Sequence, residues 1–140
     1  MTANYKPVFP RVPVMPVGQS LLTANTAKDG TGAVATLYTA GAEGSKIGNL
    51  QVAYTGSSVA TVLRLFINNG VTNATAANNS LYKSFTIPAN TLSEVAAAAD
   101  LTFELGFTLP PEYKLLATIG TTVASALIPT INGGDLHGPV

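Results

Sequence analysis

Apolar and polar residues alternate in short runs along most of this 140-residue chain, and this alternation constrains the fold more than any other feature. The clearest run lies at 100–109, where every second residue is a large apolar one. A period of two residues is that of a β-strand with one buried and one exposed face. The run predicts a strand whose inward side chains are Leu101, Phe103, Leu105 and Phe107, and whose outward residues are Thr102, Glu104 and Gly106.

Further strand-like runs lie at 33–39, 46–55, 59–68, 81–88, 114–120 and 125–131. Alternation in three of them predicts inward faces made of Leu50, Val52 and Tyr54, of Leu63, Leu65 and Ile67, and of Leu81, Phe85 and Ile87. Roughly eight short strands at this spacing are typical of a two-sheet sandwich or a small barrel. We therefore expect an all-β chain with a single antiparallel β-sandwich, jelly-roll-like, with an immunoglobulin-like topology as the rival.

Turn and loop residues separate the runs. Asn69-Gly70 and Asn132-Gly133 predict tight turns, because Asn and Gly tolerate positive φ. The stretch 70–80 has no apolar period and predicts a surface loop. The alanine-rich stretch 89–99 is compatible with a short helix or with a loose crossing between the sheets.

The first eighteen residues differ from the rest, because proline recurs at every third position from Pro7 to Pro16. Polyproline II has three residues per turn, and proline lacks the N–H that a helix or a central strand requires. We therefore expect an extended Pro-rich arm at 1–18, ahead of a sandwich domain at 19–140. This arm either runs along its own domain or lies on a neighbouring subunit. Its predicted binding residues are Pro7, Val8, Phe9, Pro10, Val12, Pro13, Val14 and Pro16.

Charged residues make up 10% of the chain, against about 25% in an ordinary soluble domain. Seven Lys and Arg residues balance seven Asp and Glu residues, so the net charge is zero. Without a basic excess or a polybasic block, we expect neither a nucleic-acid partner nor an anionic membrane partner. A neutral surface of small polar residues instead favours a protein packed against copies of itself or within a larger assembly.

Residue types that catalysis and metal binding require are scarce. The chain has no Cys, and its single His, His137, lies in a tail at 132–140 that is expected to be exposed and inert. Thiolate ligands, disulfides and a Ser-His-Asp triad are therefore not expected. Asp100 and Glu104 would lie about 13 Å apart on one strand, beyond the roughly 5–9.5 Å of glycosidase carboxyl pairs. The sequence predicts no catalytic residue, no metal site and no cofactor, and hence a protein that is not an enzyme.

Two polar features have an ordinary and a functional interpretation. The asparagines at 68–79 could hold Ca²⁺ or sugar hydroxyls, but this loop has no carboxylate, so ordinary loop residues are favoured. Arg64 is expected to extend to solvent or to meet a carboxylate. No apolar run approaches the roughly 20 residues of a membrane span, and the opening residues lack the apolar core of a signal peptide.

Three stretches resemble small virion proteins of tailed bacteriophages: TANTAKDGTGAVATLYTAGAEGSKIGNLQVAYTGSSVATVLRLFINNG, NNSLYKSFTIP and LPPEYKLLATIG. The resemblance extends from Thr23 to Gly120 and lies in the residues of these stretches and in their order, with no short diagnostic motif. Size, β-rich sequence and Pro-containing arm look most like head decoration (cement) proteins. The resemblance implies a small β-sandwich that sits on the capsid exterior as a homotrimer and locks neighbouring subunits. The implied partners are the major capsid protein and the chain itself, with the arm as the binding element.

Two other classes of function make different predictions. A tail or fibre component, or a sugar-binding module for the host surface, requires exposed aromatic residues, for which Tyr38, Tyr82 and Tyr113 are the candidates. A hydrolase on a β-sandwich requires acids that converge in a groove, for which Asp100 and Glu104 are candidates together with Glu112.

Overall fold

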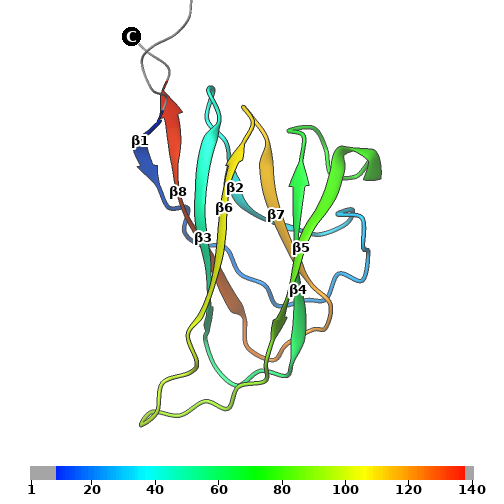
Figure 1. The fold of residues 1–140 in the computed structure, drawn as a ribbon. Coiled ribbons are helices and arrows are strands. Elements are labelled where there is room, and N and C mark those ends of the chain that lie inside the picture. The colour runs from blue at the N-terminus through cyan, green and yellow to red at the C-terminus, as the bar shows by residue number, and fades with distance from the viewer. Residues whose placement is uncertain (1–8, 138–140) are drawn as a thin grey trace, which may run out of the picture.

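The computed structural model describes residues 9–137, and residues 1–8 and 138–140 lie outside this description. Strands are the only regular elements of the described chain apart from one short 3-10 turn, and loops connect them (Figure 1). The elements are β1 (Phe9–Val14), β2 (Ala35–Thr39), β3 (Ser45–Tyr54), β4 (Thr61–Asn68), the 3-10 turn η1 (Ala76–Asn78), β5 (Asn79–Ile87), β6 (Leu101–Leu109), β7 (Lys114–Ile119) and β8 (Leu127–His137).

Two four-stranded antiparallel sheets face each other, as the alternation predicts. Sheet A has the order β1-β8-β3-β6, and sheet B has the order β2-β7-β4-β5. In this order the first strand pairs with the last, the second with the seventh, the third with the sixth and the fourth with the fifth. This is the strand order of a jelly roll, a long hairpin rolled up on itself, rather than that of an immunoglobulin-like sandwich.

The main core lies between the two sheets, on the faces that alternation assigned. On β3, Leu50 and Val52 are buried, and on β4 so are Leu63 and Leu65. Burial of one such side chain contributes about 1.5–3 kcal/mol, so these rows provide much of the energy that holds the layers together. Arg64, Phe66 and Asn68 point to the other face of β4, as the inward positions predicted for Leu63, Leu65 and Ile67 imply.

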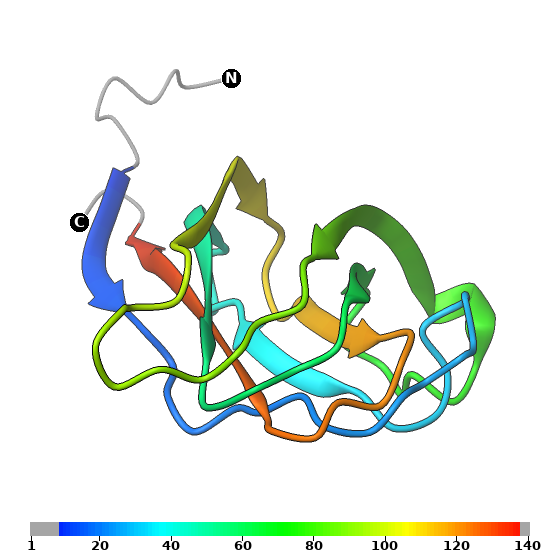
Figure 2. The same cartoon turned by 90° about the horizontal axis from the view of Figure 1, so that it is seen from below.

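A second, smaller apolar cluster lies on the outer face of sheet B. Phe66 on β4 and Leu116 on β7 are opposite each other and almost fully buried, yet they do not belong to the main core. The long segment between β1 and β2, blue in Figure 2, runs along this face. Asn25 N donates to Ile119 O at 2.8 Å and fixes that segment to β7. The outer face of sheet B is therefore covered around Phe66 and Leu116, whereas Ser84 and Thr86 of β5 stay exposed.

Aromatic side chains pack across one open side of the sandwich, between the edge strands β5 and β6. Phe85 stacks on Phe103 at a centroid distance of 4.2 Å, and Tyr82 lies 4.7 Å from Phe107. The register of β5 shifts here, because Leu65 pairs with Lys83 while Phe66 pairs with Leu81. This β-bulge turns Tyr82 inward and leaves Leu81 50% exposed. The inward position predicted for Leu81 is therefore wrong.

The turn predicted at Asn132-Gly133 is also wrong, and residues 132–137 of the predicted tail belong to a strand. They lie within β8, which pairs with β1 on one side and with β3 on the other, while residues 138–140 lie outside the described residues. A Cβ on Gly133 would lie 2.8 Å from Lys46 O and 3.1 Å from Tyr38 Cε2, so this glycine permits close packing rather than a turn. The side chain of His137 lies outside the described residues.

The two loop predictions agree better with the structure. Gly70 has φ +90°, as the turn predicted at Asn69-Gly70 requires. The segment 88–100 contains no helix and crosses from β5 of sheet B to β6 of sheet A, which is the second of its two expected conformations.

Candidate functional site

The N-terminal arm runs along its own domain from Phe9 onward, as an edge strand rather than as polyproline II. β1 pairs antiparallel with β8, with Val12 opposite Asp135 and Pro13 opposite Gly134, and Arg11 forms a bulge. An edge strand tolerates proline, because half of its N–H groups need no partner. The domain limit expected at residue 18 therefore does not separate the arm from the sandwich. Pro7 and Val8 lie outside the described residues, as does the side chain of Phe9.

Much of the apolar surface of residues 10–22, called the N-terminal segment here, faces solvent. Val14 packs against the core, but Val17 is 81% exposed. Four of the nine large hydrophobic side chains that are exposed in the described chain belong to this segment, namely Val12, Met15, Val17 and Leu22. Holding apolar side chains in place costs conformational entropy, and in water no burial of apolar surface offsets this cost. Such a segment is therefore suited to contact another molecule.

Two prolines of β1 also line a shallow pocket on the outer face of sheet A. The pocket has a volume of about 250 Å³. Glycines form much of its floor, since a Cβ on Gly134 would lie 2.9 Å from Pro10 Cβ. Its lining residues are Pro10, Pro13, Lys46, Gly48, Asn132, Gly133 and Gly134.

A second exposed apolar feature is the segment 88–100, called the tip loop here, which projects from one end of the sandwich (Figure 1). Residues 91–100 are all exposed; Val95 is 98% exposed and Leu92 56%. The loop is held only at its base, where Ser58 and Asn90 exchange two backbone hydrogen bonds of 2.9 Å and Leu92 N donates to Ser57 Oγ at 2.8 Å. The alanine run without a polar or helical period is the sequence signal that would have identified this surface.

A polar cluster of Tyr38, Ser45 and Asp135 joins the two sheets. Tyr38 Oη donates to Asp135 Oδ1 at 3.1 Å, and Ser45 Oγ donates to the same oxygen at 2.6 Å while accepting from Gly41 N at 3.1 Å. Burial raises the pKa of Tyr38. Each of these side chains is engaged in an internal hydrogen bond, and Asp135 accepts from both hydroxyl groups. The cluster is therefore best understood as a link between the sheets.

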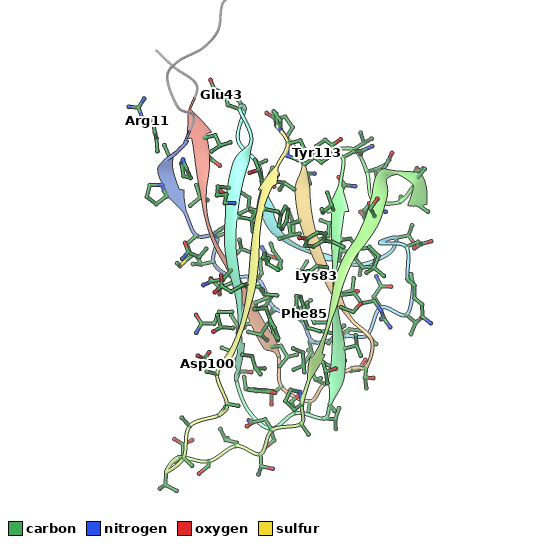
Figure 3. All side chains as sticks on the ribbon, viewed as in Figure 1. Arg11, Glu43, Lys83, Phe85, Asp100 and Tyr113 are labelled. Carbon is green, nitrogen blue, oxygen red and sulfur yellow. The ribbon has the colours of Figure 1, made fainter. Side chains whose placement is uncertain are left out.

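The acids proposed for a hydrolase do not converge. Figure 3 shows Asp100 where the tip loop meets β6, and Tyr113 near the opposite end of the molecule. Glu112 directly precedes Tyr113 in the sequence, so it lies far from Asp100. Asp100 and Glu104 are both exposed, and Asp100 accepts a hydrogen bond of 2.8 Å from Thr102. Among residues 9–137, no group of three or more His, Cys, Asp or Glu side chains could hold a metal ion.

The asparagine cluster bonds the loops of one end of the molecule to each other. Asn73 Nδ2 donates to Gly30 O at 3.0 Å and to Gly32 O at 2.8 Å. Asn79 Nδ2 donates to Asp29 O at 3.1 Å and to Asn73 O at 3.0 Å. These amides replace the strand pairing that the loops lack, which gives them a structural role in place of a ligand-binding one.

The tyrosines considered for sugar stacking do not form an exposed platform. Tyr38 is buried, Tyr82 packs on Phe107, and Figure 3 shows Tyr113 at the start of β7, where it packs half-buried against the core. No aromatic side chain whose burial the structure describes is exposed.

Comparison with known protein families, curated proteins and solved structures finds no match to this chain. The resemblance to virion proteins therefore stays a prediction, and function has to be argued from the surface. Within residues 9–137 there is also no helix with the length and apolar character of a membrane span.

Proposed function

We propose that this chain is a non-enzymatic structural protein of a tailed-phage virion, which binds the outer surface of the capsid as an oligomer and stabilises contacts between capsid subunits. The observation that carries the proposal is the exposed apolar surface of the N-terminal segment, in a chain with few charges and zero net charge. The resemblance at 23–120 and the jelly-roll sandwich, an architecture that includes viral capsid proteins, agree with it.

The N-terminal segment would act as the clamp. β1 holds its start on the edge of sheet A, so Met15 and Val17 are presented from a rigid body at little further cost in conformational entropy. Burying these side chains on a capsid subunit would gain about 1.5–3 kcal/mol for each side chain.

Several copies of this contact within one oligomer would together bind the capsid much more strongly than a single copy. A homotrimer engages several capsid subunits at once, and each further contact then forms at a high effective concentration. The tip loop offers a second apolar contact per subunit, through Leu92 and Val95. A clamp of this kind spans subunit boundaries without catalytic chemistry.

The number of copies per purified particle tests the location. A capsid lattice requires on the order of hundreds of copies, because every equivalent site is occupied. A handful of copies would move the protein to the tail or portal and favour the tail or fibre alternative. Complete absence from the particle would contradict a virion role altogether.

Binding of purified variants to capsids that lack the protein tests the clamp. The Met15→Ser/Val17→Ser double variant should bind at least tenfold more weakly, because two buried apolar contacts are lost. Val71→Ser is the matched control, because Val71 is as exposed as Met15 but lies in the loop between β4 and β5. Equal binding by both variants would contradict the role of the N-terminal segment.

Deleting residues 1–18 would be a less specific test than these two substitutions. Such a deletion removes β1 and leaves one side of β8 without a partner. The two substitutions leave this pairing intact, since both lie after the end of β1.

A further inference from the structure

Arg64 lies on the outer face of sheet B, on a central strand. Its position on β4 is opposite Ser84 of β5 on one side and Thr118 of β7 on the other. Thr86 shares this face, because it is opposite Val62, two residues from Arg64. A single cation is thus surrounded by neutral hydroxyl side chains.

The guanidinium of Arg64 has no protein acceptor within the described residues. Its Nη1 atom is buried and makes no hydrogen bond, and the same holds for Thr118 Oγ1 on the neighbouring strand. A guanidinium stays charged at any physiological pH, and a buried donor without an acceptor costs about 1–3 kcal/mol, more when it carries charge. These two buried atoms are closed to solvent, so an acceptor from outside can reach the guanidinium only through its other nitrogens.

The position of the guanidinium depends on a glycine. A Cβ on Gly120 would lie 3.2 Å from Nη1 and 3.7 Å from Nη2 of Arg64, so any other residue at position 120 would press on this side chain. The backbone of Gly120 is itself fixed, because its N–H donates to Val62 O at 2.9 Å. The missing side chain at position 120 therefore leaves room for the guanidinium beside this backbone.

An open pocket lies over this group. It has a volume of about 330 Å³, enough for a small organic anion, and its lining includes no acidic side chain. Thr61 and Thr121 are already bonded to each other across the pocket wall, with Thr121 N donating to Thr61 Oγ1 at 3.0 Å. The lining residues are Ala60, Thr61, Val62, Arg64, Thr86, Gly120 and Thr121.

We propose that this pocket binds a single carboxylate group, which Arg64 holds through two N–H bonds from Nε and Nη2, because its Nη1 is buried and out of a ligand's reach, and which the hydroxyl of Thr86 supports. The planar fork of a guanidinium matches a carboxylate, and a charge-assisted pair of this kind is about twice as strong as a neutral hydrogen bond. One positive charge balances one carboxylate, whereas a phosphate dianion would remain half-neutralised. The carboxylate belongs either to a small molecule or to an Asp or Glu side chain of a protein.

This inference does not rest on the proposed function, because a carboxylate site can exist whether or not the chain belongs to a virion. Titration of the ¹⁵N-labelled protein with sodium acetate, at constant ionic strength with chloride, tests it. The Arg64 Nε–Hε signal and the amide signals of Gly120 and Thr121 should shift and saturate. Sodium phosphate should give at least tenfold weaker binding, and a blocked Gly-Glu-Gly peptide that binds more tightly than acetate would identify a protein side chain as the source.

Two variants separate the site from general ion effects. Arg64→Gln should weaken acetate binding at least tenfold, while Arg11→Gln, which removes an exposed cation on β1, should leave it unchanged. Linear shifts that do not saturate in the unaltered protein would overturn the proposal, as would phosphate binding as tight as that of acetate. The unaltered protein gives these results by itself if Arg64→Gln fails to fold.

Discussion

The hydroxyl of Tyr38 donates a hydrogen bond of 3.1 Å to Asp135 Oδ1, and this bond connects β2 of one sheet to β8 of the other. Since Tyr38 is 1% exposed, the bond lies in a region that little water reaches. The aromatic pairs between β5 and β6 connect the sheets at the other edge of sheet B. Both sides of the sandwich are thus fastened by side chains rather than by backbone pairing.

Removing the hydroxyl of Tyr38 should weaken the fold. Tyr38→Phe leaves Asp135 with one donor fewer and should lower the free energy of unfolding by about 1–2 kcal/mol, measured by urea denaturation. Tyr82→Phe is the control, because the structure records ring packing but no hydroxyl hydrogen bond for Tyr82. A loss of the same size in both variants would contradict the role of the bond to Asp135.

Alkaline pH should destabilise the protein partly through Tyr38. Burial raises the pKa of Tyr38 above its usual value of 10.0, and it also raises that of Tyr54. The unfolded chain therefore releases these protons at a lower pH than the folded chain does. Their contribution is fully present below pH 10.0 and is lost as the pH rises toward the folded pKa. Urea midpoints between pH 8 and pH 11 should fall less steeply for Tyr38→Phe than for the unaltered protein.

The bulge in β5 predicts an inverted order of mutational effects. Tyr82→Ala should cost about 2–3 kcal/mol, because the ring packs on Phe107, whereas Leu81→Ala should cost less than about 1 kcal/mol. Strict alternation from Phe85 would predict the opposite order. Thermal and urea unfolding of the two variants distinguish the two registers directly.

The loop network predicts a large effect from a small change at Asn73. Asn73→Asp replaces a donor with a negatively charged acceptor that faces the carbonyl oxygens of Gly30 and Gly32. We expect a loss of about 1–3 kcal/mol in unfolding free energy. Asn132→Asp introduces the same change at an exposed position of β8 and should cost under about 0.5 kcal/mol. Equal losses would show that charge, rather than the carbonyl contacts, is responsible.

The tip loop should matter for binding and not for folding. Val95→Asp places a charge on a side chain that contacts little of its own chain, so the unfolding free energy should change by less than about 0.5 kcal/mol. If the loop contacts the proposed lattice, binding should fall at least tenfold, with Val71→Asp as the control. Unchanged binding would leave the N-terminal segment as the sole contact of the proposal.

Period-two alternation predicted the layers and failed where strand geometry departs from regularity. It placed Leu50, Leu63 and Leu105 correctly, because a strand with one buried face requires an apolar side chain at every second position. It misplaced Leu81, since a one-residue bulge reverses every later side chain and leaves no mark in composition. At Gly133 the local turn signal was overridden by packing under the ring of Tyr38.

The candidate binding features depend on long-range placement to different degrees. The exposed apolar residues near Val17 follow from a proline-rich stretch that cannot enter a central strand. The isolation of Arg64 could not be foreseen, because it follows from which strands lie beside β4 and in what register. The lack of acidic side chains around Arg64 arises only when the strands come together, so it cannot be read from the sequence.

The place of β8 between β1 and β3 sets a condition on when this protein can fold. The first strand of sheet A has no neighbour until the last strand has left the ribosome, since β8 is the only strand that pairs with β1 in the described chain. Sheets that depend on such distant partners form slowly, and intermediates expose their unpaired edges. A chain that still lacks β8 therefore cannot hold its N-terminal segment on the edge of sheet A, so the surface that this segment presents forms only after β8 has been made.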